Sequence, residues 1–228
     1  MTSKLTVLAF CVAAALFPAS TRAMSTTQEE RAAVQRAVPN LDRGEQLFQV
    51  CAACHQPDGR GTSDGLVPRI AGQHASVLAK QLVDFRHDKR WDLRMEHFSD
   101  RHFLVDAQAI ADVTAFIAQM PAPAPTATGP GERVQQGAAI YSRRCRSCHG
   151  GSGEGDRKQA IPRIAGQQYE YLRRQIYDAV DGRRPNFPDE HIHLLARLDH
   201  EDIIAVADFL SRSNSKAARV MRAGANGP

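Results

Sequence analysis

The sequence predicts an all-α fold built from two tandem domains of the same kind. Three observations support this prediction. The chain repeats its own motifs at an offset of 94 residues, and a repeat of this length indicates a duplicated domain. Apolar residues recur at helical spacing in both copies. No stretch alternates between apolar and polar residues for long enough to predict a β-strand.

The first residues are typical of a secretory signal peptide. A positive charge precedes an apolar run at residues 5–17, and small residues around Ala23 fit the cleavage position. The apolar run is too short to span a bilayer as a helix. We therefore expect residues 1–23 to be removed on export, together with Cys11. A lipid-modified Cys11 is the alternative, but the large Phe10 before it is unfavourable for such a site.

Residues 24–40 are predicted to form an N-terminal extension before the first domain. Residues 26–38 have the pattern of an amphipathic helix, and Thr26 and Glu29 have the spacing of a capping box. The sequence of this segment indicates no role by itself. A subunit of a larger complex could use it for docking.

The repeated region divides into domain one, residues 41–119, and domain two, residues 132–212. Each domain has a middle helix with an apolar face and a closing helix with an apolar stripe. Asp106 and Asp199 precede the closing helices and are predicted as their N-caps. These apolar faces are predicted to form the cores. The residues concerned on the middle helices are Leu78, Leu82 and Phe85 in domain one and Leu172, Ile176 and Val180 in domain two.

The segment between the domains, residues 120–131, is rich in proline and glycine. Proline lacks the amide hydrogen that helices and inner strands require, so we predict an extended linker here. Residues 213–228 follow the last predicted helix and are expected to form a C-terminal tail.

Each domain contains one Cys-x-x-Cys-His motif, at residues 51–55 and 145–149. Two thiols at this spacing form thioethers with the two vinyl groups of one haem, and the next histidine then lies under the iron as its proximal ligand. A thiol redox pair or a zinc site would leave the two histidines unexplained. The sequence therefore predicts two covalently attached haem c groups. The predicted attachment residues are Cys51, Cys54, Cys145 and Cys148, and the predicted proximal ligands are His55 and His149.

The cysteine content and the net charge indicate the cellular compartment and the kind of partner. Once Cys11 is removed, all remaining cysteines belong to the haem motifs, so no disulfide or catalytic thiol is predicted. Because this kind of haem attachment follows export, we expect the protein in the periplasm. The formal net charge of +4 is too small to indicate binding to nucleic acid. A weakly basic surface suits an acidic redox partner protein.

Together these motifs resemble the dihaem class I cytochromes c of the cytochrome c4 type. The shared features are the haem motifs, Pro-Arg-Ile-Ala-Gly-Gln at residues 68–73 and 162–167, an Arg-rich loop and a closing helix, over residues 41–212. The resemblance implies two class I cytochrome c domains with their haems near the mutual interface. It implies transfer of single electrons from a membrane-bound respiratory donor complex to a terminal oxidase or reductase. It also implies that the carbonyl groups of Pro68 and Pro162 orient the proximal histidines.

The resemblance further implies a methionine as distal ligand, in the loop before each closing helix. Domain one offers Met95, within an Asp-Leu-Arg-Met segment. His97 is an alternative, because it stands seven residues before Leu104, at the spacing of the family's methionine and leucine. His102 or an open position is the remaining alternative.

Domain two departs from the family, because no methionine lies between Cys148 and its closing helix. His191 stands seven residues before Leu198, so we predict His191 as the distal ligand there, with His193 as the alternative. Methionine ligation raises a haem potential relative to bis-histidine ligation. An electron would then rest preferentially on the haem of domain one.

The predicted function is electron transfer, not enzyme catalysis. A rival hypothesis is a dihaem enzyme of the peroxidase or thiosulfate dehydrogenase type. Peroxidase chemistry needs an open or displaceable sixth position on the iron, and the thiosulfate enzymes use a cysteine ligand that this chain lacks. A third hypothesis is a dedicated electron-transfer subunit of a larger oxidoreductase complex, docked at a membrane complex.

Overall fold

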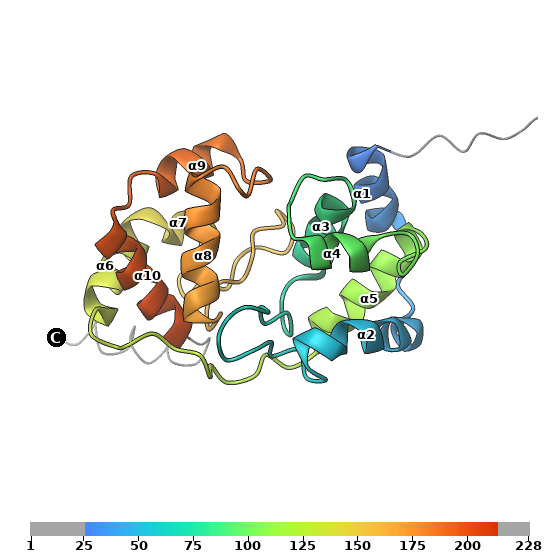
Figure 1. Ribbon diagram of the computed structural model, residues 1–228, viewed down its shortest axis with the longest axis horizontal. Helices are drawn as coiled ribbons and strands as arrows, with labels where there is room; N and C mark the ends of the chain where they lie inside the picture. Colours follow the sequence, from blue (N-terminus) through green and yellow to red (C-terminus); the bar gives the residue numbers. More distant parts are fainter. Residues whose placement is uncertain (1–25, 214–228) are drawn as a thin grey trace, which may run out of the picture.

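The computed structural model describes residues 26–213 and contains two helical lobes that lie side by side (Figure 1). Within the described residues no β-strand forms, and an isolated bridge joins Asp156 and Ile161. The all-α tandem fold is therefore confirmed. None of the helices in this part of the chain is long and apolar enough to cross a membrane. The predicted signal peptide, Cys11 and residues 214–228 of the predicted tail lie outside the described residues.

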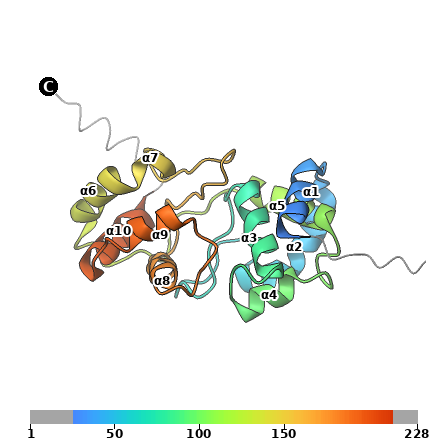
Figure 2. The same cartoon turned by 90° about the horizontal axis from the view of Figure 1, so that it is seen from above.

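Each lobe contains five helices among the described residues. The first lobe comprises α1 (Thr27–Arg36) of the N-terminal extension and the helices of domain one, which are α2 (Leu41–His55), α3 (Ala75–Arg86), α4 (Leu93–Ser99) and α5 (Ala107–Gln119). Domain two comprises α6 (Val134–Arg144), α7 (Arg146–His149), α8 (Tyr169–Val180), α9 (Asp189–Leu195) and α10 (His200–Arg212). Seen from above, α3 and α8 flank the junction between the lobes (Figure 2).

The closing helices begin where the sequence predicts. The carboxylate of Asp106 accepts a hydrogen bond from the amide of Ala109 at 2.8 Å. The carboxylate of Asp199 likewise accepts from the amide of Asp202 at 2.8 Å. Both aspartates thus satisfy an amide that the first turn of a helix leaves without a partner. The two predicted N-caps are confirmed.

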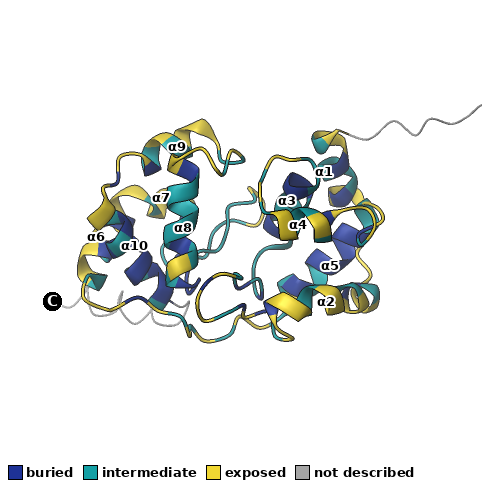
Figure 3. Cartoon of the chain, viewed as in Figure 1, coloured by how far each residue is buried: buried dark blue, intermediate teal, exposed yellow. Residues whose placement is uncertain are grey.

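The core of each domain forms where the closing helix crosses the helix that carries the haem motif (α2) or ends directly before it (α6). α5 crosses α2, and α10 crosses α6. Aromatic rings pack at both crossings: Phe48 with Phe116, with centroids 5.6 Å apart, and Tyr141 with Phe209, 5.5 Å apart. Buried residues lie on the inner faces of the helices in each lobe (Figure 3).

The predicted core residues of the middle helices pack inward with one exception. Leu78, Phe85 and Leu172 are buried. Val180, predicted as part of the core of domain two, is 39% exposed. It is the last residue of α8, where the chain turns toward Gly182, and Ala179 occupies the buried position beside it.

Helix α1 packs against domain one. The Thr26–Glu29 capping box is present, as predicted. Farther along, α1 contacts α3 and α5, and the side chain of Val34 joins the core. Its Glu30 carboxylate is buried and pairs with Arg86 and His87 of the α3 end. The helix therefore contributes both apolar and ionic contacts to this domain.

We expect the substitution Glu30→Gln to destabilise domain one by about 3 kcal/mol at neutral pH, because it leaves the buried Arg86 guanidinium without its carboxylate. Burial alone would raise the pKa of Glu30, but the hydrogen bond from His87 and the charges of Arg86 and Arg101 lower it below 4.5. A carboxylate with a lowered pKa stabilises the fold above its ordinary pKa and loses that contribution as the pH falls through the folded value.

The measurement is thermal unfolding of the haem-loaded protein at pH 7 and below pH 4. The difference between wild type and Glu30→Gln should shrink in acid. Glu29→Gln, one residue away and exposed, is the control and should have a smaller effect. An equal loss of stability in acid and at pH 7 would contradict the ionic role of Glu30.

The linker takes no helical or strand structure in residues 121–131 and runs along one edge of both lobes (Figure 1). Hydrogen bonds with side chains and backbone groups of both domains hold the linker in place. The carbonyl of Ala127 accepts from the amide of Tyr169 at 2.9 Å, and the amide of Gly131 donates to Asp208 at 2.8 Å. The Arg69 side chain donates to the carbonyl of Pro123 at 3.4 Å. The linker is therefore part of the packed structure.

Candidate haem-binding sites

The two Cys-x-x-Cys-His motifs lie at the ends of helices. In domain one, Cys51, Cys54 and His55 occupy the last turns of α2. In domain two, Cys148 and His149 lie on the short helix α7, after a break at Cys145. One more residue separates Gly137 from Cys145 than separates Gly44 from Cys51. The break takes up this extra residue, so that both the helix crossing and the haem motif are kept.

The four cysteines of the two motifs form no disulfide in the described part of the chain. No cluster of three or more metal-binding side chains occurs among residues 26–213. In each motif the first cysteine is half-buried and the second is exposed. Burial raises the pKa of Cys51 and of Cys145 to about 11.

The proximal histidines are buried and oriented by backbone carbonyls. Nδ1 of His55 lies 2.9 Å from the carbonyl oxygen of Pro68, and Nδ1 of His149 lies 3.1 Å from that of Pro162. This contact leaves Nε2 of each ring available to an iron. Burial lowers the pKa of both histidines, which favours the neutral imidazole that ligates a metal.

In domain two a second imidazole faces the proximal histidine. The rings of His149 and His191 have centroids 6.0 Å apart and planes inclined at 42°. Two imidazoles that share one metal ion through bonds of about 2 Å each have centroids roughly 6 Å apart. Phe187 packs edge-on against His191, with centroids 4.9 Å apart. Burial and then the nearby His149 and Arg184 lower the pKa of His191 to about 4. His193 on the same helix is exposed.

In domain one the corresponding position belongs to Met95. It is the third residue of α4, and His191 is the third residue of α9. The carboxylate of Asp92 caps α4 by accepting from the amides of Arg94 and Met95 at 3.1 and 3.3 Å. The loop before α9, residues 181–188, is two residues longer than the loop before α4, residues 87–92. The helices therefore align Met95, and not His97, with His191.

The alternative ligands in domain one point elsewhere. His97 is exposed, and its ring packs edge-on against Phe98 and Phe103, with centroids 5.1 and 5.0 Å away. His102 is also exposed and contacts Phe103. His97 thus belongs to an aromatic cluster on the surface of domain one.

Two half-buried arginines meet at the junction of the domains. Arg90 donates to Gln81 and, across the junction, to Gln175, both at 2.8 Å. Arg184 donates to Gln175 at 2.7 Å and across the junction to Gln81 at 3.3 Å. Burial, followed by the charge of Arg90, lowers the pKa of Arg184 to about 9. Two guanidinium groups joined by neutral amides would suit an anion such as a haem propionate, in addition to the nearby carboxylates of Asp178 and Asp84.

Neither arginine is among the site residues predicted from the sequence. The repeat contains the signal that would have identified them. Arg90 and Arg184 are 94 residues apart, as are Gln81 and Gln175, at the same offset as the haem motifs.

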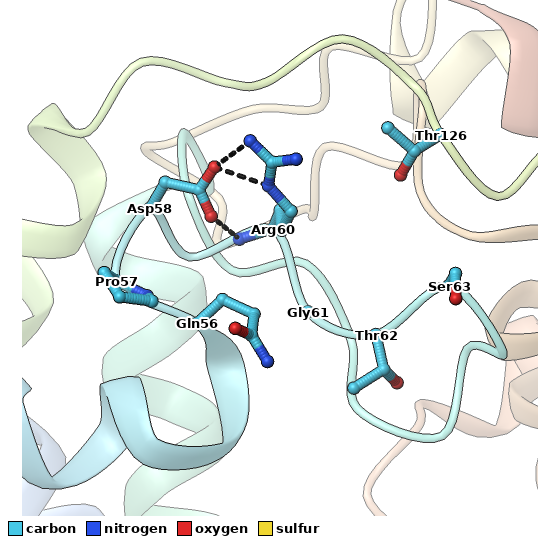
Figure 4. A pocket seen from close by; sticks show the side chains of 8 residues that line it. All are labelled: Gln56, Pro57, Asp58, Arg60, Gly61, Thr62, Ser63 and Thr126. Atoms are coloured by element: carbon cyan, nitrogen blue, oxygen red, sulfur yellow. Dashed lines mark hydrogen bonds and ion pairs between the residues drawn. The ribbon is translucent and has the colours of Figure 1, made fainter.

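A surface hollow lies on the loop that follows the first haem motif (Figure 4). An ion pair between Asp58 and Arg60 forms part of its wall. No cysteine or histidine lines this hollow. One of its lining residues, Gln56, directly follows His55 in the chain, and we assign no function to the hollow. Its lining residues are Gln56, Pro57, Asp58, Arg60, Gly61, Thr62, Ser63 and Thr126.

Two tandem helical domains, each with a free thiol pair followed by a buried and oriented histidine, define a protein with two thioether-linked haems. The sequence profile of the cytochrome c family matches residues 41–121 and again residues 134–214. The chain belongs to the cytochrome c family, within its dihaem, cytochrome c4-like group. It is a dihaem electron-transfer cytochrome with two covalently attached haem c groups.

Known proteins similar to the chain cover most of its length. Cytochrome c4 of Azotobacter vinelandii is 31% identical over 188 residues, which span 73% of this chain and 86% of the relative. A protein of Stutzerimonas stutzeri named thiosulfate dehydrogenase electron acceptor is 31% identical over 176 residues, spanning 73% and 80%. Reduced cytochrome c4 from Pseudomonas stutzeri superposes with a TM-score of 0.70 at 24% identity, covering 78% of this chain and 100% of that one, and supports the fold.

Proposed function

We propose that this cytochrome is a periplasmic carrier of single electrons that docks to redox partner proteins and transforms no substrate of its own. Its donor is a membrane-bound respiratory complex and its acceptor a terminal oxidase or reductase. The observation that carries this proposal is the facing pair His149 and His191, with ring centroids 6.0 Å apart. A second imidazole at that distance would occupy the iron coordination position that a substrate would otherwise need.

The proposed iron ligands are His55 with Met95 in domain one and His149 with His191 in domain two. Support comes from the carbonyl contacts of the proximal histidines and from the shared helix position of Met95 and His191. When bound, each haem supplies an iron that takes up and releases one electron. Burial lowers the pKa of both proximal imidazoles, and each Nδ1 atom lies against a backbone carbonyl oxygen.

The test is a stopped-flow comparison of the fully reduced, haem-loaded protein with two oxidants. We expect rapid transfer of one electron per haem to an oxidised redox protein and no sustained turnover of hydrogen peroxide. Repeated consumption of peroxide under a continuous supply of reductant would favour the rival dihaem enzyme.

A second candidate is a dedicated electron acceptor for a thiosulfate dehydrogenase. The observation that favours it is the name of the Stutzerimonas stutzeri relative, which is 31% identical to this chain. The test adds thiosulfate to the oxidised protein with and without a purified thiosulfate dehydrogenase. Reduction that requires the enzyme supports this role, and reduction by thiosulfate alone would indicate an enzyme in this chain itself.

A further inference from the structure

The repeated Pro-Arg-Ile-Ala-Gly-Gln motif joins the two domains through its last residue. Gln73 of domain one reaches Arg163 of domain two: its Nε2 donates to the Arg163 carbonyl at 2.8 Å, and its Oε1 accepts from the Arg163 amide at 2.9 Å. Gln167 of domain two makes the equivalent pair of hydrogen bonds with Arg69 of domain one. Its Nε2 donates to the Arg69 carbonyl at 2.9 Å, and its Oε1 accepts from the Arg69 amide at 3.2 Å.

The amide that each glutamine binds belongs to the peptide unit that holds a proximal histidine. In domain two, the peptide between Pro162 and Arg163 accepts the contact from His149 through its carbonyl and donates to Gln73 through its N–H. A chain of hydrogen bonds therefore leads from the proximal histidine of one domain, through one peptide unit, to a side chain of the other domain. The equivalent chain in domain one starts at His55.

Such a chain of hydrogen bonds changes the basicity of the imidazole that ligates the iron. A peptide whose N–H donates a hydrogen bond is polarised, and its carbonyl becomes a stronger acceptor. A stronger acceptor at Nδ1 raises the basicity of the imidazole as an iron ligand. A more basic ligand stabilises ferric over ferrous iron, so the hydrogen bond that the peptide N–H donates to the glutamine lowers the reduction potential of the haem.

The two hydrogen-bond chains differ in how strongly a single glutamine affects the peptide at the proximal histidine. The amide of Arg163 donates to Gln73, whereas the amide of Arg69 is shared between Gln167 and Gln168, the latter at 2.9 Å. Removing Gln167 alone leaves Gln168 in place. The larger effect of a single substitution is therefore expected at Gln73.

We propose that each domain sets the potential of the haem in the other domain: Gln73 is a positioning residue for the haem of domain two, and Gln167 with Gln168 for that of domain one. The inference rests on the two haems of the cytochrome c4-like group and on His55 and His149 as their proximal ligands. Electrode titration measures the potentials without any partner protein, so it fails or succeeds independently of the proposed carrier function.

The experiment is a redox titration of the full-length, haem-loaded Gln73→Ala variant. Proton NMR follows the haem methyl signals, assigned to each domain through His55 and His149. We expect the haem of domain two to become easier to reduce, with a roughly threefold change in its reduced-to-oxidised ratio at fixed applied potential. The haem of domain one should stay unchanged. The Nδ1 proton signal of His149 in the reduced protein should shift toward that of a weaker hydrogen bond.

The control is His74→Ala, because His74 also crosses the junction, through a 2.8 Å contact from its Nε2 to the carbonyl of Glu154, but leaves the Arg163 peptide alone. Equal shifts in His74→Ala and Gln73→Ala would overturn the proposal in favour of simple loosening of the junction. No shift in Gln73→Ala, or a shift confined to the haem of domain one, would also overturn it. The double variant Gln167→Ala/Gln168→Ala provides the reciprocal test, and it should shift the haem of domain one only.

Discussion

Replacing His191 with methionine raises the reduction potential of the domain-two haem by on the order of 100 mV, because a thioether in place of an imidazole favours ferrous iron and axial ligands set haem potentials over a range of about 0.8 V. Met95 already occupies the same position of α4. The measurement is a redox titration together with the near-infrared spectrum of the ferric protein. The methionine-to-iron band, expected from one haem in the wild type, should double in intensity.

The matched control is His193→Met, two residues farther along α9. His193 is exposed, so its replacement should leave both the potential and the band unchanged. If His193→Met and not His191→Met changes the band, the distal ligand of domain two is His193. A wild-type band that already has the intensity of two methionine-ligated haems would contradict bis-histidine ligation altogether.

The second large effect is expected on stability, from Gly137→Ala at the crossing of α6 and α10. A Cβ atom at Gly137 would overlap the carbonyl oxygen of Ala205 on α10, so the helices would have to move apart. Overpacking a closely packed contact of this kind costs about 3 kcal/mol. Chemical denaturation of the haem-loaded protein, followed by circular dichroism, measures the loss.

Two further variants sharpen this test. Gly44→Ala in domain one meets the carbonyl oxygen of Asp112 in the same way and should destabilise that domain comparably. Gln136 lies beside Gly137 and is exposed on α6, so the substitution Gln136→Ala should have little effect on stability. Unchanged stability of Gly137→Ala would mean that α6 and α10 are not in close contact there.

The starts of the closing helices and the presence of two covalently attached haems could be predicted from the sequence because they depend on short-range chemistry. A thioether-linked haem requires its two cysteines and its histidine within five consecutive residues, as at residues 51–55. An N-cap such as Asp106 bonds an amide three residues away. Such interactions are encoded in neighbouring residues, and tertiary packing has little freedom to alter them.

From the sequence we predict Met95 and His191 as the distal ligands, with His97 and His193 as alternatives, and spacing alone does not separate Met95 from His97. Counting back from the leucine before each closing helix selects His97 and His191, whereas the structure aligns Met95 with His191 through the starts of α4 and α9. The discrepancy arises because the loops on both sides of these short helices differ in length between the domains. Spacing along the chain is a reliable guide only when the loops that separate two residues have equal lengths.

The sequence by itself determined that this protein is an all-α, duplicated cytochrome with two covalently bound haems, since repeat, helical periodicity and Cys-x-x-Cys-His are local patterns. Tertiary structure alone decided which side chains from distant segments meet. The ring of His191 lies near that of His149, and the side-chain amide of Gln73 binds the backbone of Arg163. The physical reason is that these contacts join residues 42 and 90 positions apart. Helix packing and loop length bring such residues together, and no local pattern specifies either.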